Sequence, residues 1–108
     1  MLLFRFEPNF DFKPTAEQEA QMHQAWGAFI GGLAIQEKLV STHQLGFDGM
    51  KISADQSTNN GITRAENQTL GGNMIVKAND IKEAVEIAKG CPILTMGGNV
   101  EVRNILPM

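Results

Sequence analysis

The chain has 108 residues, a formal net charge of -3 at pH 7 and a sequence pI near 5.3, which fits one domain over residues 1–108 and leaves no basic stripe for nucleic acid. Charges at Arg5 and Glu7 interrupt the apolar N-terminal segment before a signal-peptide core or a membrane span could form, so we expect a soluble, cytoplasmic protein. The single cysteine excludes an internal disulfide, and no motif for a metal, flavin, haem or nicotinamide is present, so no cofactor is expected.

The chain begins with a predicted strand followed by a helix. Apolar residues at alternate positions indicate a strand over residues 2–7, and residues 9–13 are typical of a loop. Thr15, followed three residues later by Gln18, predicts a helix start with a capping box.

This first helix carries an apolar stripe and a glycine pair. Gly31 and Gly32 weaken it by about 1 kcal/mol each relative to alanine, so we expect these positions to serve close packing. The apolar residues recur at spacings of three and four and should face a sheet. They are Met22, Trp26, Phe29, Ile30 and Leu33. Trp26 and Phe29 could line a ligand cavity, but we interpret them as core residues.

Two further strands are predicted at residues 39–45 and 50–54. The composition then turns polar between Asp55 and Thr69. Within this stretch Asn59-Asn60-Gly61 is the strongest turn signal, and a strand could resume at Ile62.

The last third reads as strand, helix, turn and strand. Residues 70–78 predict a strand, and Asn79 is expected to cap the following helix. Gly90 is expected to end that helix in a left-handed conformation, and residues 100–105 predict the final strand. The apolar side of the helix is formed by Ile81, Ala84, Val85 and Ala88.

This order of elements predicts an α+β fold of the ferredoxin-like, split β-α-β type, with an antiparallel sheet and both helices on one face. The other face is then open. It would carry Leu3, Ile75 and Ile105, which is too apolar for contact with water, so we expect a homodimer that covers it.

Several segments in combination resemble the YCII-related proteins, in their DGPF-domain branch. In the last third they are Leu70-Gly71-Gly72, the helix start from Asp80 to Ala84, Gly90-Cys91-Pro92 and Val100-Glu101-Val102-Arg103. Upstream, Phe29-Ile30-Gly31-Gly32-Leu33 with Leu39-Val40 and Gln44-Leu45 is similar in spacing to the family's first helix and second strand. The resemblance implies a dimeric α+β barrel, in which two ferredoxin-like sheets close around a shared interior.

The chain departs from the family at its signature. Asn60-Gly61-Ile62-Thr63 stands where DGPF would be, and the acidic, lysine-bearing run after it is reduced to residues 64–68. The glycine expected at the end of the first helix is replaced by Glu37 or Lys38. An activity that depends on the DGPF loop therefore does not carry over with the resemblance.

Strand parity suggests which polar residues could form a site. If the helix-facing set is Phe4, Met74, Val76, Val100 and Val102, the opposite set points toward the barrel interior or its rim. That opposite set is Arg5, Asn73, Lys77, Glu101 and Arg103. The parity of His43 matches Leu39, Ser41 and Leu45 and leaves its face open.

Two interpretations of these polar residues remain. In the first, His43 is a general acid or base, Glu66 orients it, and Arg5 or Arg103 holds an anionic substrate, with Asn73 as a further ligand contact. In the second, Arg103 and Glu101 form interface ion pairs and His43 is an ordinary exposed or hydrogen-bonded histidine. The protein is then either a small cofactor-independent enzyme for a compact anion or a non-catalytic dimeric ligand-binding or accessory module.

Two further residues have weaker signals. His23 lies beside the apolar stripe of the first helix, and some YCII relatives suggest a His-Asp pair, but no Asp stands at the matching place. We therefore interpret His23 as solvent-facing and keep ligand binding as its alternative role. Cys91 has no adjacent cation to lower its pKa and is interpreted as a small buried apolar residue.

Overall fold

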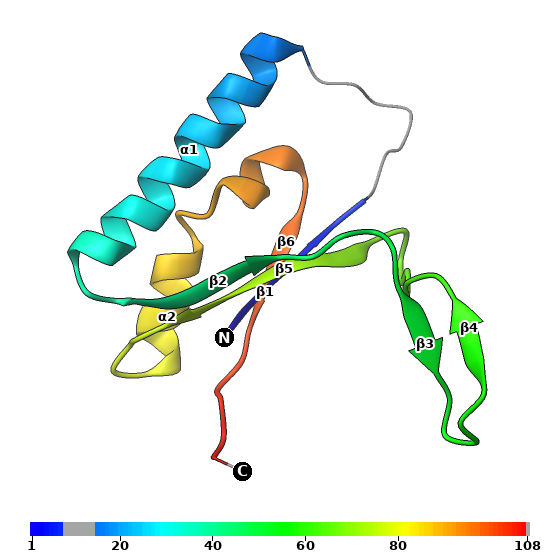
Figure 1. Ribbon diagram of the computed structural model, residues 1–108. Coiled ribbons are helices and arrows are strands. Elements are labelled where there is room, and N and C mark those ends of the chain that lie inside the picture. Colours follow the sequence, from blue (N-terminus) through cyan, green and yellow to red (C-terminus); the bar gives the residue numbers. More distant parts are fainter. Residues whose placement is uncertain (8–14, 108) are drawn as a thin grey trace.

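A four-stranded antiparallel sheet with the strand order β2-β5-β1-β6 forms the centre of the protein (Figure 1). The computed structural model describes residues 1–7 and 15–107, so the loop predicted at residues 9–13 lies outside the described residues. The strands are β1 (Leu2–Phe6), β2 (Leu39–Gln44), β5 (Thr69–Val76) and β6 (Asn99–Val102). Helix α1 (Ala16–Ile35) follows β1, and helix α2 (Ile81–Ala88) follows β5. This is the split β-α-β order of ferredoxin-like domains, so the predicted fold class is confirmed.

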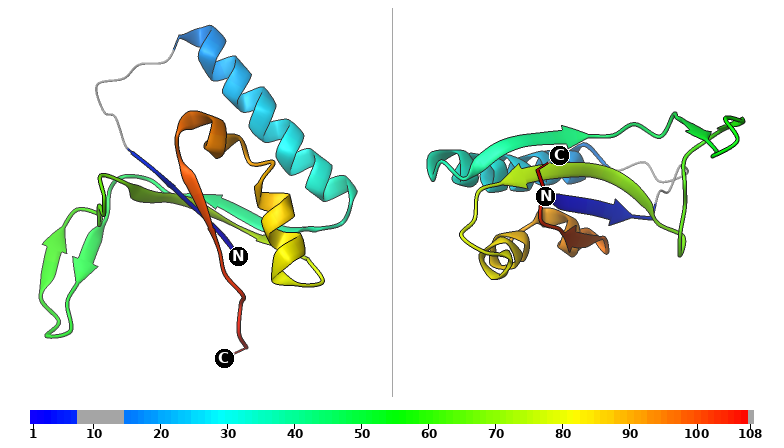
Figure 2. Two further views of the ribbon diagram at one scale, coloured as in Figure 1. Left: turned by 180° about the vertical axis from the view of Figure 1, so that it is seen from behind. Right: turned by 90° about the horizontal axis from the view of Figure 1, so that it is seen from below.

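The hydrophobic core lies on one face of the sheet. Leu2 of β1 and Met74 of β5 stand opposite each other, and both are fully buried. Leu33 of α1 and Ala88 of α2 belong to the same buried cluster, so both helices cover this face, as predicted. The right panel of Figure 2 looks toward the other face, with α1 behind the sheet. Half-buried apolar residues complete the core: Phe6, Trp26, Phe29, Ile30, Leu39, Val76, Ile87, Val100 and Val102. Val76, Val100 and Val102 are on the helix side, as the parity argument predicted.

Helix α1 begins as its sequence predicts. Thr15 Oγ1 accepts the backbone N–H of Gln18 at 3.1 Å, and Gln18 Oε1 accepts the N–H of Thr15 at 3.0 Å, which is a complete capping box. The Trp26 ring meets Phe4 edge-on, with centroids 5.5 Å apart, so Trp26 is a core residue. A side chain added at Gly31 or Gly32 would meet no atom within 4 Å, so close packing within the single chain does not explain these glycines.

Helix α2 differs from the prediction at both ends. Its N-cap is Asp80 rather than Asn79, because the Asp80 carboxylate accepts the N–H of Glu83 at 2.8 Å. The Asn79 side chain instead donates to the Glu83 carboxylate at 2.9 Å. Gly90 does not adopt the left-handed conformation, because the chain leaves the helix through tight turn bonds from Gly90 N–H to Ile87 O and from Cys91 N–H to Ala88 O.

The polar stretch between β2 and β5 forms a separate β-hairpin. Strands β3 (Met50–Ile52) and β4 (Thr58–Asn60) pair with each other and make a two-stranded sheet. Asn59 and Asn60 therefore lie in a strand, and the turn that they were expected to form is at residues 53–57 instead. There the Asp55 carboxylate accepts the N–H of Ser57, and hydrogen bonds from Ser57 hold the pKa of Asp55 below its usual range.

The end of the chain also differs from the prediction. A short 3₁₀ helix, η1 (Pro92–Met96), lies between α2 and β6 and was not expected. The final strand ends at Val102 rather than at Ile105, so pairing within the sheet does not fix the side on which Ile105 lies. The expected strand at Ile62 is absent from the described chain, and the sheet resumes at Thr69.

Candidate functional site

Strand register places one row of side chains across the face of the sheet that the helices leave open, called here the open face. His43 on β2 stands opposite Asn73 on β5, and Asn73 stands opposite Leu3 on β1. Leu3 in turn stands opposite Glu101 on β6. Side chains directly opposite each other in antiparallel strands lie on the same face. Because the neighbouring Met74 is in the core, this row of four residues lies on the open face.

A bulge in β2 settles the face of His43. Leu39 pairs with Val76 on the helix side, and Ser41 pairs with Ile75, so Val40 is an extra residue that reverses the alternation. Parity counted from Leu39 would have placed His43 on the wrong face. The adjacent apolar residues Leu39 and Val40 break the pattern of alternation in the sequence, which is the signal that could have indicated the bulge.

A charged cluster lies at the β6 end of this row. The guanidinium of Arg5 on β1 donates to the Glu101 carboxylate at 2.8 Å, and an Arg103 nitrogen lies 3.8 Å from the same carboxylate. Arg5 and Glu101 are 35% and 45% exposed and Arg103 is 69% exposed, so water weakens both ion pairs. Two guanidinium groups and one carboxylate leave one net positive charge at this point of the open face.

His43 and this charged cluster are well separated. Three strand spacings of about 4.8 Å lie between His43 and Glu101, so about 14 Å separates the two positions. His43 therefore has Asn73 rather than an arginine as its nearest polar neighbour in the row. The structure brings the predicted residues onto one face but divides them into two groups.

Glu66 is not near His43 in the single chain. It occupies a two-residue turn in which Ala65 and Gln68 exchange backbone hydrogen bonds at 2.8 and 2.9 Å, before β5 begins at Thr69. His43 of β2 pairs with Asn73 of β5, and Asn73 lies four residues beyond Thr69, which is about 13 Å along the strand. Glu66 has a φ of 54°, and Asn67 a φ of 64°, which are the left-handed values that such a hairpin turn requires. Its negative charge is therefore presented at the tip of a turn rather than toward the histidine.

The two remaining candidates lie apart from the open face. His23 is exposed on α1, which packs on the opposite side of the sheet. Cys91 is 2% exposed within the core, and burial raises the pKa of its thiol, so the interpretation as a buried apolar residue is confirmed. Over residues 1–7 and 15–107 no group of three or more His, Cys, Asp or Glu side chains is placed to hold a metal ion. No helix in the same part of the chain combines the length and apolarity needed to cross a membrane.

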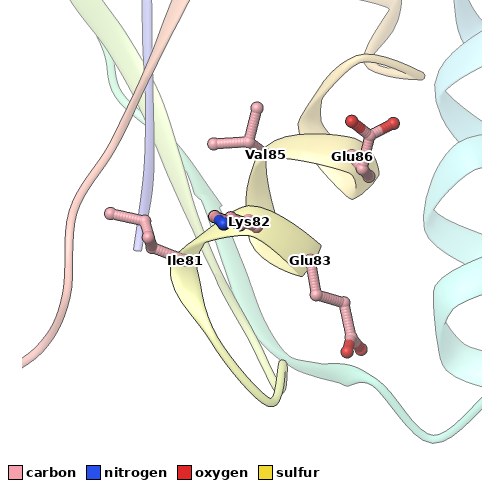
Figure 3. A pocket seen from close by; sticks show the side chains of 5 residues that line it. All are labelled: Ile81, Lys82, Glu83, Val85 and Glu86. Atoms are coloured by element: carbon pink, nitrogen blue, oxygen red, sulfur yellow. The ribbon is translucent and has the colours of Figure 1, made fainter.

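Two shallow hollows occur elsewhere on the described surface. One is formed by α2 alone and has no second wall; its lining residues are Ile81, Lys82, Glu83, Val85 and Glu86 (Figure 3). The other lies at the base of the hairpin between Phe47 and Gly61, and it includes Asn60-Gly61 of the segment that replaces DGPF. Neither hollow includes an open-face residue from the row or the charged cluster. Small-molecule sites are usually concave, and neither of these two hollows encloses the open face.

The comparisons with known proteins identify a family but no close curated relative. The family model described as the YCII-related domain matches residues 1–108, the whole of the chain. No curated protein matches the sequence.

Proposed function

The chain belongs to the YCII-related domain family, and we propose that it works as a homodimer that binds a compact anionic molecule between two facing sheets. The observation that supports this proposal is the composition of the open face. It combines apolar residues, Leu3 and Ile75, with the Arg5-Glu101-Arg103 cluster on one side of one sheet.

The apolar residues of the open face favour a second copy as its cover. An antiparallel sheet can leave one face in water when that face is polar, but Leu3 and Ile75 make this face partly apolar, and an exposed apolar surface favours association. In a two-fold symmetric dimer the same face serves as both surfaces, so one chain supplies the whole cover.

The charged cluster favours an anion as the ligand. Guanidinium groups bind carboxylates and phosphates through paired hydrogen bonds, and covering the face would remove the water that now weakens these interactions. Arg103 is the more available of the two arginines, because Arg5 is held at 2.8 Å by Glu101.

Binding is tested by NMR titration of the protein with benzoate, with benzamide as the uncharged control, and with inorganic phosphate as a non-aromatic anion. We expect chemical-shift changes at Arg5, Asn73 and Arg103 for an anion and much smaller ones for benzamide. The double variant Arg5→Gln/Arg103→Gln should lose these changes. Lys82→Gln, which removes a positive charge on α2, is the matched control and should retain them. Equal responses of the double variant and the parent protein would contradict the proposal.

A second candidate function is proton transfer by His43. It is favoured by the position of this imidazole opposite Asn73, on the face that would line the enclosed space. The two histidines provide an internal comparison, because His23 lies on α1 away from that face. When benzoate is added in an NMR experiment, an enzyme should show changes in the imidazole resonances of His43 and none in those of His23. If the His43 resonances do not respond and His43→Ala binds benzoate as the parent does, the protein is a binding module without this base.

A further inference from the structure

The β3–β4 hairpin extends away from the rest of the protein (Figure 1), and residues 49–61 are called here the arm. Its base is closed where the N–H of Gly61 donates to the carbonyl of Gly49 at 2.8 Å. Phe47, two residues before the base, meets Phe6 of β1 edge-on with ring centroids 5.7 Å apart, and this contact joins the arm to the body. Beyond the base, β3 and β4 pair only with each other among the described strands.

The two faces of the arm have different compositions. Met50 and Ile52 are two residues apart in β3 and therefore lie on one face, where they stand opposite Asn60 and Thr58. Lys51 lies on the other face, opposite Asn59. Met50 is 64% exposed and Ile52 is 73% exposed, so the apolar face of the arm has little cover within its own chain.

An arm of this kind is not stable without a cover. An isolated two-stranded hairpin is marginal in water and needs a hydrophobic face packed on something else. The radius of gyration of the Cα atoms is 15.5 Å, whereas a compact domain of this length has one of about 13 Å. The single chain is thus extended, and the arm contributes to that extension.

The arm and the C-terminal segment project in the same direction. Figure 1 shows both extending from the sheet on the side opposite α1, which is the side of the open face. The C-terminal segment also carries exposed apolar residues, because Ile105 is 56% exposed and Leu106 is 76% exposed. A second copy that covers the open face would therefore lie between two apolar extensions of the first.

The open face and the extensions beside it together offer the area that an interface needs. At about 4.8 Å per strand and about 3.3 Å per residue, a sheet of four short strands covers roughly 400 Å² in projection, and its protruding side chains expose more accessible surface than that. Stable interfaces of standard size bury about 800 Å² of accessible surface on each partner. The exposed apolar residues of the arm and of the C-terminal segment would add to the area that the sheet supplies.

We propose that the arm is an intermolecular clamp, which packs its Met50–Ile52 face onto a second copy of this chain. The inference rests on the proposed homodimer and adds the element that makes the dimer stable. Because a two-fold dimer is symmetric, each copy gives one arm and receives one.

The test compares two faces of the arm in the full chain. In Met50→Gln/Ile52→Thr the apolar face becomes polar while Ile52→Thr keeps a β-branched residue in the strand. Lys51→Thr is the matched control on the opposite face. By sedimentation equilibrium, we expect the dissociation constant of the dimer to rise about tenfold or more in the double variant and to stay within about twofold of the parent in the control.

Two measurements separate the possible failures. A parent protein that is monomeric at 100 µM would overturn both the homodimer and the clamp. A dimeric parent with an unchanged dissociation constant in the double variant would overturn the clamp alone. Hydrogen exchange gives a second readout that does not depend on the variants: the amides of β3 and β4 should be protected at concentrations where the dimer forms and exchange rapidly after dilution to the monomer. Equal exchange at both concentrations would also overturn the clamp.

Discussion

The two faces of the central sheet are made by the same strands, yet their environments are opposite. Leu2, Phe4 and Met74 are at most 4% exposed on the helix side, in contact with α1 and α2. Their immediate neighbours in sequence, Leu3 and Asn73, lie on the open face. One residue of shift along a strand therefore separates a core position from a position on the open face.

This difference indicates a division of roles. Every buried side-chain N or O atom in the described part of the chain has a hydrogen-bond partner, so the helix side has no unsatisfied polar group that would indicate a site. The open face carries the charges, the amide of Asn73 and the imidazole of His43. Substitutions on the helix side should thus act on the free energy of unfolding, and those on the open face on association and ligand binding.

The largest effect is expected from adjacent substitutions in β5. Met74→Ala removes a fully buried side chain and should lower the free energy of unfolding by about 2–5 kcal/mol. Asn73→Ala, one residue away, should change the free energy of unfolding of the monomer by no more than about 0.5 kcal/mol. Denaturant unfolding followed by the fluorescence of Trp26, at a protein concentration where the chain is monomeric, measures both. Comparable losses in the two variants would show that the open face also belongs to the folding core.

A smaller loss in the free energy of unfolding is expected at Gly71 of β5, where the regular alternation of side chains between the two faces is interrupted. The pairing of β1 with β5 shifts after Phe4, so Gly71 has no direct partner in β1. A Cβ at Gly71 would overlap the Phe6 ring, so Gly71→Ala should force that ring aside and cost about 1–3 kcal/mol in denaturant unfolding.

Gly31→Ala is the control for that substitution. It adds a methyl group in open space within α1 and should stabilise the protein by about 0.5–1 kcal/mol. A stable Gly71→Ala variant would mean that Phe6 can leave its place without loss. If Gly31→Ala weakened dimer formation instead of stabilising the chain, α1 would be part of an interface.

The sequence predicted the fold because its strongest signals are periodic. Alternation in β1, the spacing of three and four in α1 and the capping box at Thr15 are local patterns, and each acts where the pattern predicts. Two of the errors occur where more than one residue has the chemistry for a single role. Asp80 and Asn79 are both good N-cap residues, and Asp80 is the cap because the helix begins at Ile81. Asn59-Asn60-Gly61 has turn chemistry, yet the turn forms at Asp55 because the strands pair in a register that places the asparagines opposite Lys51 and Met50.

The candidate site was only partly predictable for a different reason. Parity assigned Arg5, Asn73 and Glu101 to one face correctly, because Leu3 pairs with both Asn73 and Glu101, and β1 pairs with β6 without a shift as far as Arg5. It could not assign His43, because the bulge at Val40 is a property of two paired strands. The distance from Glu66 to His43 likewise depends on where a turn ends relative to the partner strand. The sequence pattern of one strand does not contain that information.

The smallest change in stability, with an opposite change in binding, is expected from Glu101→Gln. This substitution removes the carboxylate that holds Arg5 and lies near Arg103, and exposed ion pairs contribute about 0–1 kcal/mol. The free energy of unfolding should therefore fall by less than about 1 kcal/mol. Two unneutralised guanidinium groups should then bind benzoate severalfold more tightly, and less so as the salt concentration rises.

Glu86→Gln provides the matched control, because it removes a carboxylate from an exposed ion pair with Lys89 on α2. It should leave benzoate binding unchanged in the same titration. Weaker binding in Glu101→Gln would mean that the carboxylate positions the arginines for the anion rather than competing with it. Equal binding in both variants would mean that the anion binds elsewhere and that the charged cluster does not make the open face a binding surface.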